Sequence, residues 1–208
     1  MSNILKKYAI PLILSHICIA LIFALPKPDL WMAYDRTAVN DGQFWRFLTP
    51  NFVHLGAWHT ILNLIGLWFT MLLFINLLKN IDWLAWFTLL FIGNIVGLHL
   101  WVPSLDHYVG MSGALYGLIA AAAVAELRLG VKLSGLLLLI VGLKIFMPQL
   151  FGVETSYNEW LGGNVIEEAH IIGFIQGLIL GLVWPKSRLS KPKSLKGSPN
   201  SEVDKTKW

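Results

Sequence analysis

The sequence predicts an all-α membrane protein with six transmembrane helices, and two properties carry this prediction. Of the 208 residues, 56% are hydrophobic and only 13% are charged, whereas a soluble domain has roughly a quarter of its residues charged. The charged residues also lie mostly at the ends of apolar runs instead of interrupting them. The net charge of +4 is therefore interpreted as a topology signal and not as a nucleic-acid-binding surface.

The first apolar run covers residues 8–25, close to the ~20 residues that a helix needs to cross a bilayer. It follows Lys6 and Lys7, and a cleaved signal peptide would show the same basic start. No clear small-residue cleavage site follows the run, and Pro26-Lys27-Pro28 ends it abruptly. We therefore expect an uncleaved first span.

The other five predicted spans cover residues 58–78, 83–102, 112–126, 132–147 and 169–184. Before the second span, residues 27–57 mix aromatic and charged side chains, which is typical of a segment lying in the membrane interface. The fourth run is too short to cross a hydrocarbon core of roughly 30 Å. Its first residue, Ser112, is therefore expected to lie below the membrane surface.

The distribution of basic residues predicts where the chain termini lie. If both termini are cytoplasmic, the cytoplasmic segments hold twelve Lys and Arg residues, five before residue 133 and seven after residue 184. The external segments then hold only Lys27, Arg36 and Arg46. The positive-inside rule favours this arrangement, and it brings Ser112 and His170 near the same external face.

The chain divides into one predicted domain, residues 1–185, and a tail. Residues 186–208 are rich in Lys, Ser and Pro, so we expect a basic, disordered cytoplasmic tail. No internal repeat and no second domain is apparent. The single cysteine, Cys18, lies in an apolar run and is interpreted as a small packing residue.

The stretch Gly110-Met111-Ser112-Gly113 opens the fourth apolar run and is the first candidate for chemistry. A serine at the start of a helix is most often an N-cap, because its oxygen accepts from a free backbone N–H group. Glycines on both sides favour a second interpretation, since they let a substrate or another backbone come close. A catalytic role for Ser112 then requires a general base nearby.

A base is available in the sixth apolar run, which begins with Ala169 and His170. Glycines at 173, 177 and 181 follow at helical spacing, and the fourth run offers small residues at 113, 117 and 121. Small faces of this kind let two membrane helices pack closely. Their packing would bring His170 toward Ser112, and a serine beside a histidine is a nucleophile beside its base.

Two other side chains could orient His170. Glu167 lies three residues earlier, although a solvated carboxylate in the membrane interface is its favoured interpretation. Tyr116 lies one turn after Ser112, and its ring could stack on the imidazole. Lys144, inside the fifth run, is expected to extend outward to the membrane surface.

The second run contains His59 and Asn63 four residues apart, so they share one face of the predicted helix. Both carry N–H donors that could stabilise the negative oxygen formed when Ser112 attacks a peptide carbonyl. Hydrogen bonds that only hold the bundle together are an equally open interpretation. Asn94, in the third run, is interpreted as a packing group.

These residues, in this order, resemble the rhomboid family of intramembrane serine proteases. The shared motifs are Gly-x-Ser-Gly at 110–113, His59-x-x-x-Asn63, Ala169-His170 followed by glycines, Trp45-Arg46, and His54. The resemblance covers all six predicted spans. It implies a six-transmembrane-helix rhomboid-like bundle in which residues 1–185 form the protease domain.

The resemblance also implies roles for individual residues. Ser112 would be the nucleophile and His170 the general base and acid. The Ser112 backbone N–H group, His59 and Asn63 would form the oxyanion site, and Arg46 would stabilise the first loop. The supporting positions are Tyr116, Gly110, Gly113, Arg46 and His54.

The expected function is that of a serine endopeptidase that cleaves membrane-anchored proteins near the external membrane face. The sequence of residues 108–113 resembles that of the rhombosortase branch, whose members process proteins with C-terminal Gly-Gly-containing anchors. The expected partners are transmembrane or C-terminally anchored protein substrates and the lipid bilayer, with no nucleic acid, cofactor or metal. A bacterial inner membrane, with both termini cytoplasmic, is the expected location.

Three rival functions depend on other residues, and a small transporter, the fourth, would be expected to show paired unwound half-helices, which are not apparent. A metal-dependent membrane protease would need a His-Glu-x-x-His run, which the sequence lacks. An aspartyl intramembrane protease would need aspartates deep within a span, and none is so placed. A non-catalytic rhomboid-like protein that binds or escorts membrane clients would be expected to lack the serine or the histidine, and both are present.

Overall fold

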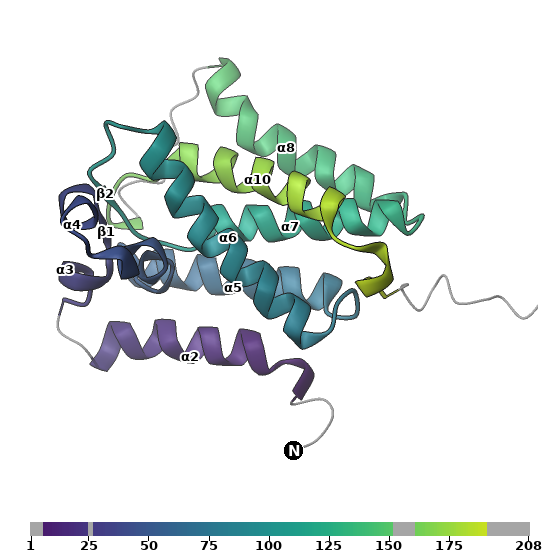
Figure 1. Ribbon diagram of the computed structural model, residues 1–208, viewed down its shortest axis with the longest axis horizontal. Helices are drawn as coiled ribbons and strands as arrows, with labels where there is room; N and C mark the ends of the chain where they lie inside the picture. Colours follow the sequence, from purple (N-terminus) through teal and green to yellow (C-terminus); the bar gives the residue numbers. More distant parts are fainter. Residues whose placement is uncertain (1–5, 25–26, 152–160, 191–208) are drawn as a thin grey trace, which may run out of the picture.

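The computed structural model describes residues 6–24, 27–151 and 161–190 and shows a bundle of long helices (Figure 1). The long helices in these ranges are α2 (Ala9–Ala24), α5 (Ala57–Phe74), α6 (Asn80–Trp101), α7 (Ser112–Arg128), α8 (Leu133–Phe151) and α10 (Glu167–Val183). Each begins and ends within a few residues of a predicted apolar run. The predicted helical class is therefore confirmed.

Two of these helices, α5 and α6, are long and apolar enough to cross a membrane by length and composition alone. The helices α2 and α8 contain shorter apolar stretches, at Ala9–Phe23 and Leu133–Met147. The count of six spans therefore stays a prediction.

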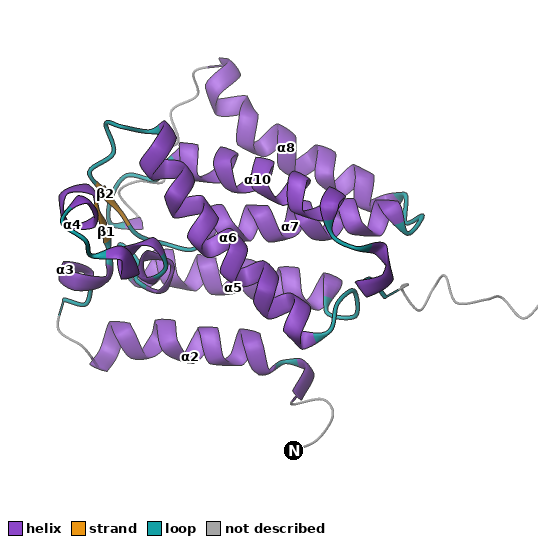
Figure 2. Ribbon diagram, in the orientation of Figure 1, coloured by secondary structure: helices purple, strands orange, loops and turns teal. Residues whose placement is uncertain are grey.

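The predicted interfacial segment folds into a series of short elements at one end of the bundle (Figure 1). They are α3 (Asp29–Met32), β1 (Tyr34–Asp35), α4 (Arg36–Asn40), η1 (Phe44–Phe47) and η2 (Thr49–Phe52). Figure 2 shows β1 beside β2 (His107–Tyr108), and the two pair antiparallel with Tyr34 opposite Tyr108. This pairing ties the first loop to the residues that lead directly to Ser112.

Arg46 holds the same loop together from inside. Its side chain is only 6% exposed. The guanidinium donates hydrogen bonds to the carbonyl oxygens of Ala33 at 2.6 Å and Leu30 at 2.9 Å. It also donates to Gln43 Oε1 at 2.7 Å. The end of α3 and the start of η1 are thereby joined around one buried cation.

The central helix of the bundle is α7. It contacts α5, α6, α8 and α10, and the side chains from Leu118 to Ala125 are all buried. Five of these eight residues are alanine, which lets the neighbouring helices approach closely. Ser112 is thus the first residue of the helix that the others surround.

The contact between α7 and α10 is made backbone to backbone through glycine. A Cβ atom at Gly177 would collide with the carbonyl oxygen of Gly117, and one at Gly181 would lie 2.5 Å from that of Ala121. A Cβ atom at Gly173 would likewise collide with the carbonyl oxygen of Gly113. The predicted packing of these two small faces is confirmed.

The packed chain continues past the sixth long helix. After α10 a short helix η3 (Lys186–Arg188) turns back, and Arg188 Nε lies 2.6 Å from Asp82 Oδ1. The backbone N–H group of Ser190 donates to the carbonyl oxygen of Leu77 at 2.8 Å. The folded part therefore reaches Ser190, beyond the predicted boundary at 185, and the rest of the predicted tail lies outside the described residues.

Candidate active site

Ser112 and His170 meet at the end of the bundle that carries the short elements. Ser112 begins α7, and His170 lies in the first turn of α10. Ser112 Oγ is 2.9 Å from His170 Nε2. In the imidazole tautomer that carries its proton on Nδ1, the serine hydroxyl donates to Nε2. The two side chains are therefore a hydroxyl and a base within proton-transfer distance.

The start of α10 is held against α7 by a buried amide. Asn94 Nδ2, on α6, donates to the carbonyl oxygen of Ala169 at 2.8 Å. A Cβ atom at Gly113 would lie 2.5 Å from Asn94 Oδ1. The interpretation of Asn94 as a packing group is confirmed, and the packing it provides fixes the residue next to His170.

Tyr116 lies beside His170, and Lys144 contacts Tyr116. The ring of Tyr116 has its centroid 4.7 Å from that of His170, with 57° between the planes. This is a tilted contact and not the parallel stack suggested by the spacing. Lys144 Nζ donates to the Tyr116 hydroxyl and lies 5.0 Å from the ring centroid. Lys144 is exposed, and its ammonium contacts Tyr116 on α7, a partner that the sequence did not predict.

His59 faces the glycine stretch before Ser112. The backbone N–H group of Leu55 donates to His59 Nδ1 at 3.3 Å, so a neutral ring carries its proton on Nε2. A Cβ atom at Gly110 would lie 3.1 Å from His59 Nε2, and the φ angle of Gly110 is +113°. Gly110 thus combines a left-handed backbone with room for the imidazole, two conditions that only glycine meets.

Asn63 lies one turn further along α5. Its Nδ2 donates to the carbonyl oxygen of His59 at 2.8 Å, which uses one of two N–H bonds. Its Oδ1 is buried and has no hydrogen-bond partner among the described residues. Asn63 therefore keeps hydrogen-bonding capacity beyond its contact with its own helix.

His54 packs its ring against His59, with the centroids 5.1 Å apart and the planes at 87°. Burial lowers the pKa of His54 to about 3, and the neighbouring His59 acts in the same direction. The ring is therefore neutral near pH 7. Across residues 6–24, 27–151 and 161–190, no three His, Cys, Asp or Glu side chains gather as a metal site.

An apolar cleft of about 710 Å³ opens onto Ser112 and His170. We call it the cleft; side chains of α5, α7, α8 and α10 line it. His59, Asn63 and Lys144 are among its few polar groups. Ser112 can thus be approached from between α5 and α8.

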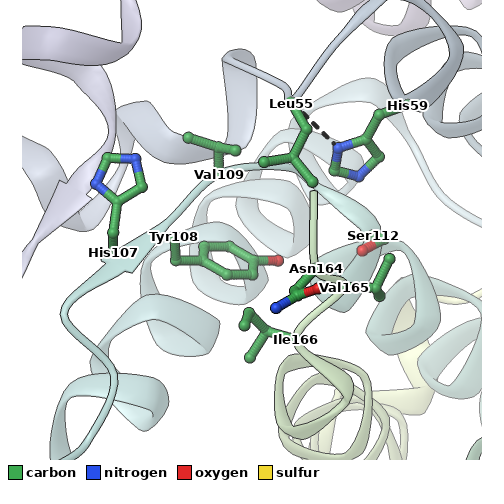
Figure 3. A pocket seen from close by; sticks show the side chains of 9 residues that line it. All are labelled: Leu55, His59, His107, Tyr108, Val109, Ser112, Asn164, Val165 and Ile166. Carbon is green, nitrogen blue, oxygen red and sulfur yellow. Dashed lines mark hydrogen bonds between the residues drawn. The ribbon is translucent and has the colours of Figure 1, made fainter. Parts of the chain in front are cut away.

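A second, smaller pocket of about 50 Å³ also reaches Ser112 (Figure 3). His59 and Tyr108 line this pocket, and the Tyr108 hydroxyl points toward Asn164 and Ser112. Ser112 therefore lines both a large apolar space and a small, more polar one.

Tyr108 is a site residue that the sequence analysis did not single out. Its side chain is buried, and its hydroxyl makes no hydrogen bond of normal geometry with the described residues. Burial raises the pKa of Tyr108 to about 12, and the nearby Ser112 side chain and Gly113 backbone partly offset this effect. The sequence signals for Tyr108 were its place four positions before the serine and its inclusion in the stretch 108–113 that resembles the rhombosortase branch.

Comparison with known proteins identifies the family. Residues 41–187, more than two thirds of the chain, match the Rhomboid domain model. Rhomboid protease GlpG of Haemophilus influenzae is 28% identical over 202 residues, which cover 90% of this chain and 97% of that protein. Rhomboid protease GlpG of Photorhabdus laumondii is 27% identical over 165 residues, which cover 73% of this chain and 51% of that protein. The chain belongs to the rhomboid family of intramembrane serine proteases.

Proposed function

We propose that this rhomboid protease cleaves peptide bonds with Ser112 as nucleophile and His170 as general base and acid. The single observation that supports this assignment is the 2.9 Å separation of Ser112 Oγ and His170 Nε2 at the wall of the cleft. A hydroxyl is a weak nucleophile at neutral pH unless a base removes its proton during attack. Among the described residues, the base hydrogen-bonded to this hydroxyl is the His170 imidazole.

The proposed reaction follows from this pair. His170 takes the hydroxyl proton as Ser112 Oγ bonds to the substrate carbonyl carbon, and the carbonyl oxygen becomes negative. His170 then gives the proton to the leaving amine as the peptide bond breaks, which leaves an acyl-enzyme. A water molecule, deprotonated by His170, releases the second product by the same steps.

The negative oxygen needs donors placed before the reaction begins. We assign this task to the Ser112 backbone N–H group, His59 Nε2–H and the free N–H bond of Asn63. The Leu55 contact to His59 Nδ1 supports the required tautomer. The absence of a side chain at Gly110 leaves the space through which His59 approaches the glycine stretch.

The remaining site residues act through these groups. Tyr116 limits the movement of the His170 ring, and Gly113 lets α10 approach Ser112. His54 packs on His59 as a neutral ring. Arg46 keeps the first loop in place over the site. None of them touches the bond that is cleaved.

The proposed substrates are proteins held in the membrane by a transmembrane segment or a C-terminal anchor. The apolar cleft suits an apolar chain, and the polar end of the bundle suits cleavage near the external face. The resemblance of residues 108–113 to the rhombosortase branch extends the proposal to Gly-Gly-type anchors. The charge distribution and the bacterial relatives favour an inner membrane with both termini cytoplasmic.

The alternative is a rhomboid-like protein that binds membrane clients without cutting them. Such a protein needs the cleft but not the dyad. The hydrogen-bonded Ser112 and His170 favour catalysis, because binding alone gives no reason for a base beside a hydroxyl.

A fluorophosphonate probe tests the assignment. The wild type in detergent should be labelled covalently at Ser112, whereas Ser112→Ala and His170→Ala should not. Ser104→Ala, which removes an exposed loop hydroxyl outside the cleft, is the matched control and should label like the wild type. Undiminished labelling of Ser112→Ala would disprove the proposed nucleophile.

A further inference from the structure

Lys144 is an exposed cation at the wall of a largely apolar cleft. It lines the same space as Ser112 and His170, together with apolar side chains such as Leu62, Ile65 and Ile119. An ionisable side chain within a membrane span is costly, and it usually persists because it binds something. The catalytic steps proposed above give Lys144 no task.

The charge of Lys144 is not matched by an acid of the described chain. The salt bridge found within residues 6–24, 27–151 and 161–190 joins Arg188 to Asp82, at the far end of the bundle. The contacts of the Lys144 ammonium are the hydroxyl and ring of Tyr116. An ammonium has three N–H donors, and one hydrogen bond to a phenol leaves two.

The position of Lys144 indicates how far along a bound substrate its ammonium lies from the cleaved bond. Its ammonium touches Tyr116, which lies one helical turn from Ser112, about 6 Å along α7. An extended substrate chain advances ~3.3 Å per residue. A substrate segment that enters the cleft from Ser112 therefore reaches Lys144 about two residues from the scissile bond.

We propose that Lys144 selects substrates that carry an acidic side chain within about three residues of the cleaved bond, on the segment that lies in the cleft. The proposal rests on the proposed function, because it uses Ser112 as the reference point. A carboxylate there would pair with the ammonium in an apolar surrounding, where a charge-assisted hydrogen bond is strong. The same site would discriminate against a basic residue at that position.

Two other roles for Lys144 make different predictions. If Lys144 only holds Tyr116 in place, its loss slows the cleavage of every substrate by the same factor. If it binds an anionic lipid headgroup, its effect depends on the lipid and not on the substrate. A specificity role alone changes the ratio of rates between acidic and neutral substrates.

The test uses single-span reporter proteins in liposomes of neutral phosphatidylcholine. Paired reporters carry Glu or Gln at each of the three positions on either side of the cleaved bond. At one position of the cleft segment, the wild type should cleave the Glu reporter with about tenfold higher kcat/KM than the Gln reporter. Lys144→Met should bring this ratio to about one, and Lys144→Glu should favour a Lys reporter instead.

Lys132→Met is the matched control, since Lys132 is an exposed lysine just before α8 that does not line the cleft. It should keep the Glu preference. The proposal is overturned if the wild type shows no preference, or if the preference survives in Lys144→Met. It is also overturned if Lys144→Met slows both reporters equally, or if the preference follows added anionic phosphatidylglycerol.

A competition measurement tests the preference for Glu even where a reporter is bound but not cleaved. The same Glu and Gln segments are used as competitors of fluorophosphonate labelling, and the Glu segment should protect Ser112 at about tenfold lower concentration. Equal protection overturns the proposal. Failure of the proposed function has a different signature, since Ser112→Ala would then still cleave or still label. Ser112-dependent cleavage without a Glu preference overturns only the role of Lys144.

Discussion

At the scale of single residues, the oxyanion assignment can be separated from helix packing through Asn63. Asn63→Ala should lower kcat by roughly 10- to 1000-fold with little change in KM, because the lost donor acts only in the transition state. The melting temperature should change little, since its hydrogen bond is to its own helix. All three quantities are measured in one detergent.

Asn94→Ala is the matched control for this prediction. Its amide joins α6 to α10 through the Ala169 carbonyl group, so its loss should lower the melting temperature clearly. If Asn63→Ala instead kept near-wild-type kcat and melted much earlier, Asn63 would be a packing residue. The same comparison applies to His59→Ala.

The Tyr108 hydroxyl gives a second residue-scale prediction. It is buried beside Ser112 without a hydrogen bond of normal geometry, in the small pocket of Figure 3. If it donates to the substrate oxygen, Tyr108→Phe should lower kcat by about tenfold and leave KM unchanged. Tyr34→Phe, which alters the paired position on β1, should leave kcat unchanged. Unaltered kcat in Tyr108→Phe would exclude the donor role.

The sequence could nominate Ser112, His170 and His59 because residue type and helical spacing carry that information. It could not nominate Tyr108, since its place beside Ser112 depends on the pairing of β1 with β2, two segments far apart in the chain. The same limit applies to the contact between Lys144 and Tyr116. Composition describes the membrane around a lysine, but not the phenol on a neighbouring helix that it meets.

At the scale of helices, the α7–α10 contact predicts which glycine matters. Gly177→Ala should lower activity at least about tenfold, because the added methyl group meets the Gly117 carbonyl oxygen and pushes α10 away. The proposed general base, His170, lies seven residues earlier, so the effect would come from the distance between Ser112 and His170. Cleavage rate and fluorophosphonate labelling rate measure it.

Gly142→Ala is the control on another helix. A Cβ atom there meets Phe174 at an ordinary 3.5 Å, so activity should stay close to that of the wild type. Equal activity of Gly177→Ala and Gly142→Ala would show that α10 can shift without harm to the site. The glycine spacing predicted this contact correctly, because spacing fixes which face of a helix is small.

At the scale of the whole molecule, composition and basic residues were enough to predict a helical bundle and the residue range of each long helix. They could not predict that the chain turns back after α10 and packs residues 186–190 against the bundle. Four of the five residues 186–190 are lysine, arginine or serine, which is typical of a tail. Their packing against the bundle includes the ion pair of Arg188 with Asp82, an acid at the start of α6 that is only 2% exposed.

The Arg188–Asp82 ion pair should affect the stability of the protein and not its catalytic rate. Arg188→Ala leaves the Asp82 carboxylate buried without its cation, which should cost about 1–3 kcal/mol in the free energy of unfolding. The lower part of that range is expected, because the Arg188 side chain is 51% exposed and the ion pair is partly screened. The melting temperature in detergent should fall, while kcat should not, since the proposed dyad lies at the start of α10 and Arg188 lies beyond the end of that helix (Figure 1). Lys186→Ala, in the same turn, should change neither the melting temperature nor kcat.

In the double variant Asp82→Asn/Arg188→Ala, much of the lost stability should return, because no charge is left buried. A fall in kcat without a fall in melting temperature would show that this end of the bundle is coupled to the site.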